Sequence, residues 1–154
     1  MKRFYTAESV TEGHPDKLCD LIADSILDAC LKEDENSRVA CEVLATKGNI
    51  IVAGEITSRF EPQVFEIIRK VLENAGYDAS GIYMDALIHK QSPDIAGAVE
   101  RSRERRAGTV SVQSGPANGA GDQGIMVGYA CDETPQLMPM PVVLANRIVR
   151  ELSA

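Results

Sequence analysis

A helical repeat of apolar residues between Pro15 and Leu31 constrains the fold of this chain more than any other feature of its sequence. Apolar residues recur there every three or four positions, while Asp20, Asp24 and Asp28 line another face. This spacing predicts an amphipathic helix with one buried stripe. The stripe is expected to contain Leu18, Leu21, Ile22, Ile26, Ala29 and Cys30.

The next segments predict a small sheet and a second helix. Two β-rich runs flank Thr46–Asn49, which indicates a hairpin. A second apolar stripe begins after Pro62 and ends at Gly76, a residue suited to a helix C-terminus. The expected strands are residues 2–6, 38–45, 50–58 and 81–89. The order β-α-β-β-α-β predicts an α+β sandwich, with helices on one face of a mixed or antiparallel sheet.

The remainder of the 154 residues has a different character. Residues 92–121 contain a charged run and many small residues, and a loop of this length is usually a lid, a binding loop or a disordered segment. Residues 123–130 resemble a strand, and a last helix is expected from about Pro141.

Composition excludes several classes of protein. The net charge of −7 argues against nonspecific binding to nucleic acid or to an anionic membrane. No apolar run approaches the roughly 20 residues of a membrane span, and the N-terminus lacks the apolar segment of a signal peptide. Four cysteines lie far apart without a CxxC pair, which favours free thiols in a cytoplasmic protein.

The sequence Gly13-His14-Pro15-Asp16-Lys17 lies at the predicted start of the first helix. Proline is favoured at the first helical position, so His14 is expected at the N-cap and Asp16 in the first turn. Free amides and the helix dipole attract phosphate there, and a carboxylate suits Mg²⁺. The motif therefore indicates a metal–polyphosphate site. The alternative is a proline-initiated helix with an acidic first turn, which is a common surface feature.

Two glutamates, Glu42 and Glu55, fall inside predicted strands, where acidic residues are disfavoured. If Gly48 and Asn49 form the turn, the two glutamates face each other directly. If all of residues 46–49 form the loop, they are diagonal neighbours. Both registers place them on one face. That face is either solvated or holds a cation or a substrate ammonium group.

Two further segments suggest ligand contacts. Residues 89–94, His-Lys-Gln-Ser-Pro-Asp, end a strand and open the long loop, where ligand-binding side chains often lie. Residues 119–124, Gly-Ala-Gly-Asp-Gln-Gly, allow close approach of the backbone to a ligand. This block is neither a dinucleotide-binding fingerprint nor a P-loop, and a glycine-rich turn before a strand is the plainer interpretation.

Taken together, these segments resemble the amino-terminal part of S-adenosylmethionine synthase (methionine adenosyltransferase), and the resemblance covers essentially the whole chain. The matching blocks are Thr6–Lys17, Arg38–Glu42, Gly54–Thr57, Lys90–Ile95, Gly119–Gly124 and Leu137–Pro139. The resemblance implies adenosyl transfer from ATP to the sulfur of L-methionine, followed by cleavage of triphosphate to pyrophosphate and phosphate. The expected division is an N-terminal domain at 1–91, a mobile active-site loop at 92–121 and the start of a central domain at 122–154.

The resemblance also assigns roles to residues. It implies that His14, Lys17 and Asp122 contact ATP, with His14 catalytic at the phosphate and 5′-oxygen. It further implies Mg²⁺ and K⁺ as cofactors and a homo-oligomer, dimer or tetramer, with sites between subunits. Of the remaining residues, it assigns Asp16 and Glu8 to Mg²⁺, Glu42 to K⁺, and Glu55 and Gln91 to methionine.

The family's chain is more than twice as long and has three similar α+β domains, of which this sequence would supply the first and the start of the second. The later lysine- and arginine-bearing segments that contact triphosphate are absent from this sequence. We therefore expect a fragment with little or no activity alone. The alternative is a non-catalytic interaction module that docks on a full-length synthase or a complementing chain.

Overall fold

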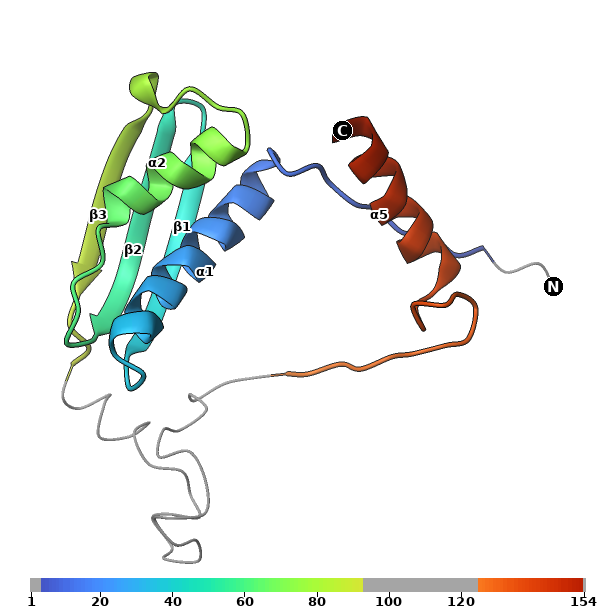
Figure 1. The fold of residues 1–154 in the computed structure, drawn as a ribbon, viewed down its shortest axis with the longest axis horizontal. Helices are drawn as coiled ribbons and strands as arrows, with labels where there is room; N and C mark the ends of the chain where they lie inside the picture. Colours follow the sequence, from blue (N-terminus) through green and yellow to red (C-terminus); the bar gives the residue numbers. More distant parts are fainter. Residues whose placement is uncertain (1–3, 93–124, 154) are drawn as a thin grey trace, which may run out of the picture.

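The computed structural model describes residues 4–92 and 125–153. Its main body has two layers, with helices α1 and α2 on one face of a three-stranded sheet (Figure 1). The elements are α1 (Pro15–Glu33), β1 (Arg38–Thr46), β2 (Asn49–Thr57), α2 (Val64–Asn74), the 3₁₀ helix η1 (Ala79–Gly81), β3 (Tyr83–His89) and α5 (Met140–Ser153). The predicted α+β class, with helices on one face of the sheet, is confirmed.

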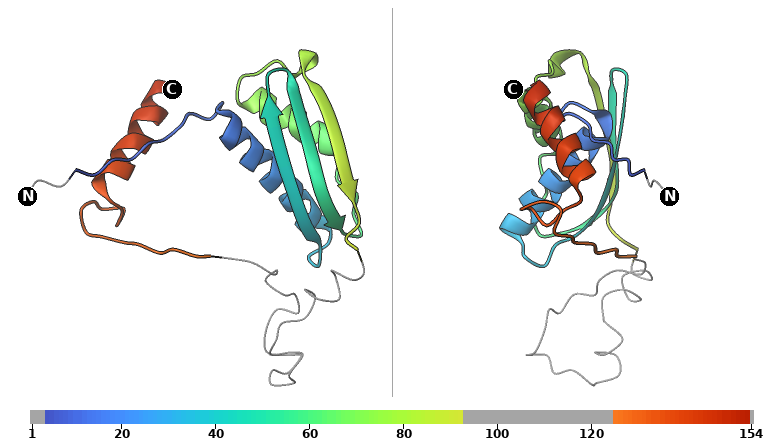
Figure 2. Two further views of the ribbon diagram at one scale, coloured as in Figure 1. Left: turned by 180° about the vertical axis from the view of Figure 1, so that it is seen from behind. Right: turned by 90° about the vertical axis from the view of Figure 1, so that its right-hand side faces the viewer.

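The sheet is mixed and has the order β1-β2-β3. Strand β1 is antiparallel to β2, and β3 is parallel to β2 (Figure 2). The hairpin turn is Lys47–Gly48, because Thr46 pairs with Asn49. Gly48 has φ +73°, a conformation that costs glycine little and other residues more. The turn therefore sits one residue earlier than the Gly48–Asn49 alternative.

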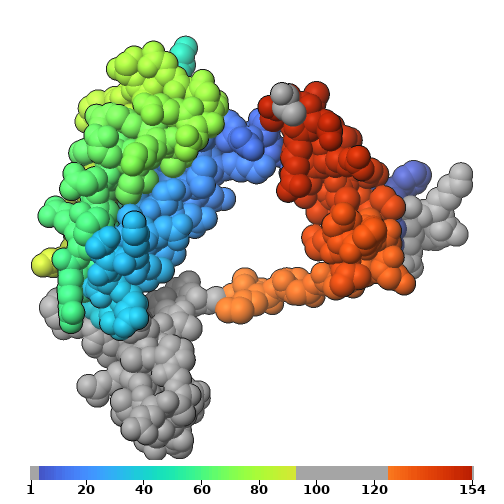
Figure 3. All heavy atoms as spheres, viewed as in Figure 1, coloured from blue at the N-terminus to red at the C-terminus, as the bar shows by residue number. Residues whose placement is uncertain are grey.

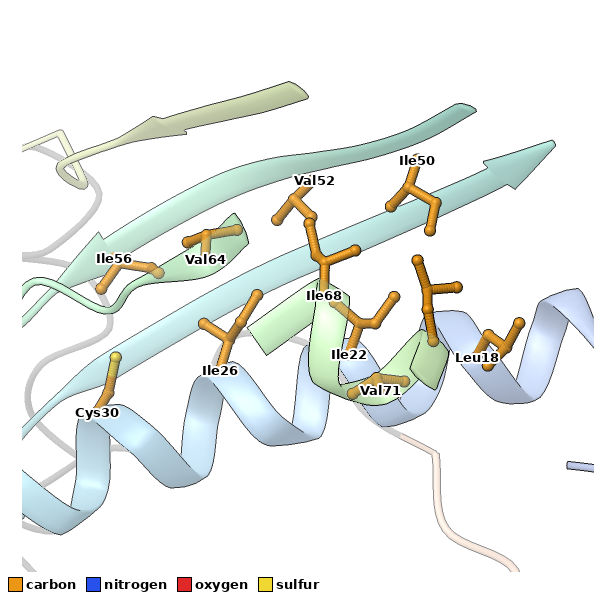
Figure 4. Close-up of a cluster of buried hydrophobic side chains, with 11 residues drawn as sticks. Leu18, Ile22, Ile26, Cys30, Ile50, Val52, Ile56, Val64, Ile68 and Val71 are labelled. Carbon is orange, nitrogen blue, oxygen red and sulfur yellow. The ribbon is translucent and has the colours of Figure 1, made fainter. Parts of the chain in front are cut away.

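The core lies between the two helices and the covered face of the sheet (Figure 4). Its fully buried side chains are Ile22, Ile26, Cys30, Val52, Ile68 and Leu72. Burying one such aliphatic side chain contributes about 1.5–3 kcal/mol. The predicted stripe of α1 is confirmed at Leu18, Ile22, Ile26 and Cys30, whereas Ala29 is half-buried and Leu21 is 49% exposed. The buried spacing of four residues, at 18, 22, 26 and 30, leaves position 21 at the side of the stripe.

A polar cluster joins the C-terminal end of α1 to the end of β2. The carboxylate of Asp34 accepts hydrogen bonds from the backbone amides of Arg59 (2.9 Å) and Asn36 (3.1 Å). These two bonds, led by that from Arg59, hold the pKa of Asp34 below its usual value. The buried Ser37 hydroxyl lies 2.7 Å from that of Ser58. This end of α1 is therefore fixed against the end of β2.

Helix α2 ends as its sequence predicts. Gly76 has φ +83°, and its amide donates to the Glu73 carbonyl at 3.0 Å. The amide of Tyr77 donates to the Leu72 carbonyl at 2.9 Å. These two bonds define a Schellman motif, which stops the helix and fixes the direction of the following residue.

Two expected strands are not formed in the described residues. Residues 4–6 and 125–130 are not assigned to any strand. The predicted last helix is confirmed as α5, which lies apart from the two-layer body (Figure 3). The N-terminal segment runs beside it, and the Ser9 hydroxyl donates to Asn146 Oδ1 at 2.7 Å. Helices long and apolar enough to cross a membrane are absent from the described ranges.

Candidate functional site

The first part of the candidate site is the N-terminus of α1. His14 is the N-cap, Pro15 occupies the first turn and Asp16 follows it, as the sequence predicts. The His14 amide donates to the Thr11 carbonyl at 3.1 Å, closing a turn before the helix. The His14 carbonyl accepts from the Leu18 amide at 3.0 Å. The His14 backbone is therefore held on both sides.

The imidazole of His14 has a defined orientation. Its Nδ1 accepts a hydrogen bond from the Asp16 amide at 3.2 Å and lies 3.8 Å from Asp16 Oδ2. Because Nδ1 is the acceptor, the proton of the neutral ring lies on Nε2. The His14 side chain is 39% exposed. This arrangement leaves an N–H donor beside the helix N-terminus, where the dipole also favours an anion.

The other residues expected at this end are less closely assembled. The Asp16 side chain is 91% exposed, and Glu8 lies exposed in the N-terminal segment. The Lys17 ammonium donates to the Val10 carbonyl at 2.5 Å. Within residues 4–92 and 125–153, no three His, Cys, Asp or Glu side chains are grouped to hold a metal. Asp16 nevertheless suits Mg²⁺, which usually takes one or two carboxylates and completes its shell with phosphate oxygens and water.

The second part is the face of the sheet that the helices leave open, which faces the viewer on the left of Figure 2. Glu42 lies opposite Ala53, so it is diagonal to Glu55 and on the same face. The diagonal register is confirmed, and the directly facing one is wrong. Glu42 is exposed and Glu55 is half-buried. This face also carries exposed apolar side chains, namely Leu44, Tyr83 and Leu87.

Glu55 lies near the end of β2, where β3 also ends because the two strands are parallel. The register pairs Glu55 with His89. Two residues further on, Gln91 Oε1 is buried, and no described residue gives it a hydrogen bond. An unpaired buried acceptor costs about 1–3 kcal/mol, so this oxygen can accept a bond from a ligand. A carboxylate and an amide oxygen at one end of the sheet suit a ligand with an ammonium group.

The two parts of the candidate site lie at opposite ends of the domain. Cys19, near the start of α1, contacts the Ala45 backbone at the hairpin end of the sheet. Asp34, just after α1, contacts Arg59 at the other end, where Glu55 lies. The 19 residues of α1 span about 28 Å. The structure therefore does not bring His14 together with Glu55 within one chain.

Some predictions fall outside the described residues. They concern Asp122, the rest of the glycine-rich block, and the loop expected at 92–121, of which only Ser92 is described. A cavity of about 780 Å³ lies between the start of α2 and the end of β3, lined by Phe60, Phe65 and Lys90 among others. None of the predicted site residues lines this cavity, although Lys90 directly precedes Gln91.

Sequence reasoning missed Tyr77, whose hydroxyl donates to the Gly13 carbonyl at 2.7 Å. Tyr77 lies outside every motif and every predicted helix or strand, and 64 positions separate it from Gly13. The one local signal is Gly76, which marks the end of α2 and fixes where the next side chain goes.

Two models of one protein family match separate segments of this chain. The family model "S-adenosylmethionine synthetase, N-terminal domain" matches residues 2–97, and the model of the central domain matches residues 117–154. An S-adenosylmethionine synthase of Parafrankia sp. (strain EAN1pec) is 47% identical over 159 residues, covering 99% of this chain and 40% of the relative. One from Roseiflexus castenholzii (strain DSM 13941 / HLO8) is 49% identical over 160 residues, covering 97% of this chain and 39% of the relative. The chain thus spans about two-fifths of the length of these curated relatives.

Proposed function

Because this chain belongs to the S-adenosylmethionine synthetase family, we propose that it supplies part of a site that makes S-adenosylmethionine from ATP and L-methionine. The observation that carries the proposal is the His14 N-cap: its Nδ1 is held by the Asp16 amide, which leaves Nε2–H as a donor on a residue at a helix N-terminus suited to phosphate. Both substrates are water-soluble, and the described cysteines are free thiols, which is consistent with the proposed cytoplasmic location.

In the proposed reaction, the methionine sulfur attacks C5′ of ATP and triphosphate leaves. The leaving oxygen gains negative charge in the transition state, so donors aimed at it lower the barrier. His14 Nε2–H is such a donor, and the positive end of the α1 dipole adds to it. Asp16 and Glu8 would hold Mg²⁺, which neutralises phosphate charge when bound. Lys17 would stand near the phosphates while its ammonium also holds the Val10 carbonyl.

We propose that methionine binds at the other end of the sheet. The Glu55 carboxylate would pair with the substrate ammonium, and Gln91 Oε1 would accept one of its hydrogens. Glu42, on the same open face, would bind K⁺. Asp122 would contact ATP. These assignments follow the family resemblance, and the side-chain chemistry of the described residues agrees with them.

Because the His14 end and the Glu55 end lie far apart in one chain, a complete site would need a second subunit. We propose that each complete site takes its His14 end from one subunit and its Glu55 end from another. The open face would be the contact, because exposed Leu44, Tyr83 and Leu87 offer apolar area beside the charged groups. This arrangement makes residues 1–154 a contributor to catalysis, and we expect little or no turnover from the chain alone.

Methionine binding tests the proposal directly. Calorimetric titration of L-methionine into the chain should give a saturable signal that Glu55→Gln weakens at least tenfold, since the charged hydrogen bond is lost. Glu61→Gln is the matched control, because Glu61 is an exposed glutamate beyond β2. Equal binding by the wild-type chain and Glu55→Gln would reject the methionine assignment.

The alternative function is a non-catalytic module that docks on a synthase or a complementing chain. The exposed apolar residues of the open face favour some association. Light scattering of the chain, with and without a full-length synthase, distinguishes the two functions when combined with the titration. Association without methionine binding supports the module, and methionine binding supports the enzyme.

A further inference from the structure

The C-terminus of α2 lies against the turn that carries His14. Gly76, at φ +83°, ends the helix and directs Tyr77 away from it. The Tyr77 hydroxyl then donates to the Gly13 carbonyl at 2.7 Å. The residue that follows that carbonyl is His14. A contact between two helix ends thus fixes the peptide immediately before the N-cap.

The fit between Tyr77 and Gly13 is close. A Cβ added at Gly13 would lie 3.1 Å from Tyr77 Cε2 and 3.2 Å from its hydroxyl oxygen. The next nearest atom, at 3.5 Å, is also in the Tyr77 ring. Gly13 is not in the left-handed region, so its small size, and not its conformational freedom, is what this contact uses.

The position of the Gly13–His14 peptide affects the His14 imidazole through two hydrogen bonds. The His14 amide donates to Thr11 O at 3.1 Å, and the Asp16 amide donates to His14 Nδ1 at 3.2 Å. If the Gly13 carbonyl rotates, the first of these bonds must change, because the Gly13 carbonyl and the His14 amide belong to one peptide plane. The cap bond that keeps the proton on Nε2 depends in turn on the His14 backbone.

We propose that Tyr77 is a positioning residue for His14. Its hydroxyl and ring fix the Gly13–His14 peptide, so that Nδ1 caps α1 and the orientation of the Nε2–H donor is set. The importance of this for turnover rests on the proposed function, but the effect on His14 geometry does not. Tyr77 itself is not assigned to the reacting atoms.

Tyr77→Phe tests the proposal, with Tyr83→Phe as the matched control. Tyr83 is an exposed tyrosine on the open face, and its hydrogen bond to Gly48 is made by its backbone. We expect Tyr77→Phe to speed exchange of the His14 and Asp16 amides by about twofold to tenfold, the range for loss of one hydrogen bond. Exchange at Val52, in the buried core, should stay within about twofold of the wild-type rate.

The imidazole gives a second readout. The chain has two histidines, so ¹⁵N spectra of the rings, assigned with His89→Gln, report the tautomer of His14. At alkaline pH the wild-type ring should favour the Nε2–H form, and Tyr77→Phe should lower that preference. Unchanged exchange and tautomer, or an equal rise in exchange at Val52, would overturn the proposal. Neither substrate is present, so the result is independent of whether the chain binds methionine or ATP.

A double-mutant cycle isolates the contact. Gly13→Ala should speed exchange of the same two amides in the wild-type background, because the new methyl group meets the Tyr77 ring. In a Tyr77→Ala background the same change should alter those rates by less than about twofold, since the three atoms nearest to the new methyl group all belong to Tyr77. An equal effect in both backgrounds would show that Gly13 acts through something else and would refute the assignment.

Discussion

A methyl group added at Gly54 is expected to destabilise this domain more than one added at any other described glycine. Gly54 has φ +146°, and its added Cβ would lie 2.0 Å from the Ala40 carbonyl oxygen. It would also lie 3.1 Å from Cys41 Cα. Both neighbours are backbone atoms of β1, so no side-chain rotation relieves the contact, and the pairing of β1 with β2 must shift.

The size of the effect follows from two terms. Holding a residue with a side chain at this φ costs about 1–3 kcal/mol. Forcing a methyl group into packed surroundings costs about 1–3 kcal/mol more. We therefore expect Gly54→Ala to lower the free energy of unfolding by about 2–6 kcal/mol, a large part of the 5–15 kcal/mol typical of a domain. Glu55 follows directly, so its position on the open face should shift as well.

Urea unfolding followed by circular dichroism measures this loss. Gly48→Ala is the control: Gly48 has φ +73°, but nothing lies within 4 Å of its added Cβ. The free energy of unfolding of Gly48→Ala should fall only by the cost of holding alanine at a positive φ, about 1–2 kcal/mol. If Gly54→Ala is no less stable than Gly48→Ala, the close approach of β1 to Gly54 is wrong, and so is the reasoning from it.

Three further predictions concern the core, pH and the open face. Ile22→Ala should lower the free energy of unfolding by about 2–5 kcal/mol, whereas Leu21→Ala, at a half-exposed side chain, should lower it much less in the same urea titration. Asp34 has a lowered folded-state pKa because two backbone amides bind its carboxylate, so its stabilising contribution is present above the unfolded pKa and is lost as pH falls through the lower folded value. Asp34→Asn should therefore destabilise the chain at neutral pH, and the difference in melting temperature from wild type should shrink as the pH falls below the usual carboxyl range; a constant difference would contradict this. Glu42→Gln should leave stability unchanged or raise it by up to about 1 kcal/mol in thermal unfolding, because it relieves like-charge repulsion with the diagonal Glu55.

Local sequence signals predicted most of the two-layer body. The Pro15 start of α1, the stripe through Ile22 and Ile26, and the Gly76 end of α2 each depend on short-range periodicity or on one backbone conformation. The hairpin was predicted, but its register was left between two choices. The pairing of Thr46 with Asn49 decides it, and Gly48 takes its positive φ within the resulting Lys47–Gly48 turn.

These local signals could not predict contacts between residues that are far apart in the sequence. Residues 125–130 have strand-like composition, but a strand requires a hydrogen-bonded partner, and none of the described residues provides one. The contact of Tyr77 with Gly13 joins two helix ends and leaves no periodic trace in the sequence. The motifs likewise identified His14 and Glu55 as candidate ligand-binding residues. They did not predict that these two residues lie at opposite ends of the sheet.

The central claim is that one chain carries two separate ligand-binding ends. Amide NMR spectra of the chain, recorded with L-methionine and separately with Mg²⁺·ATP, test it most directly. Methionine should shift the resonances of Glu55 and Gln91, and Mg²⁺·ATP should shift those of His14 and Asp16. If both ligands shifted the same set, or if neither shifted its own, the assignment of the two ends would be contradicted.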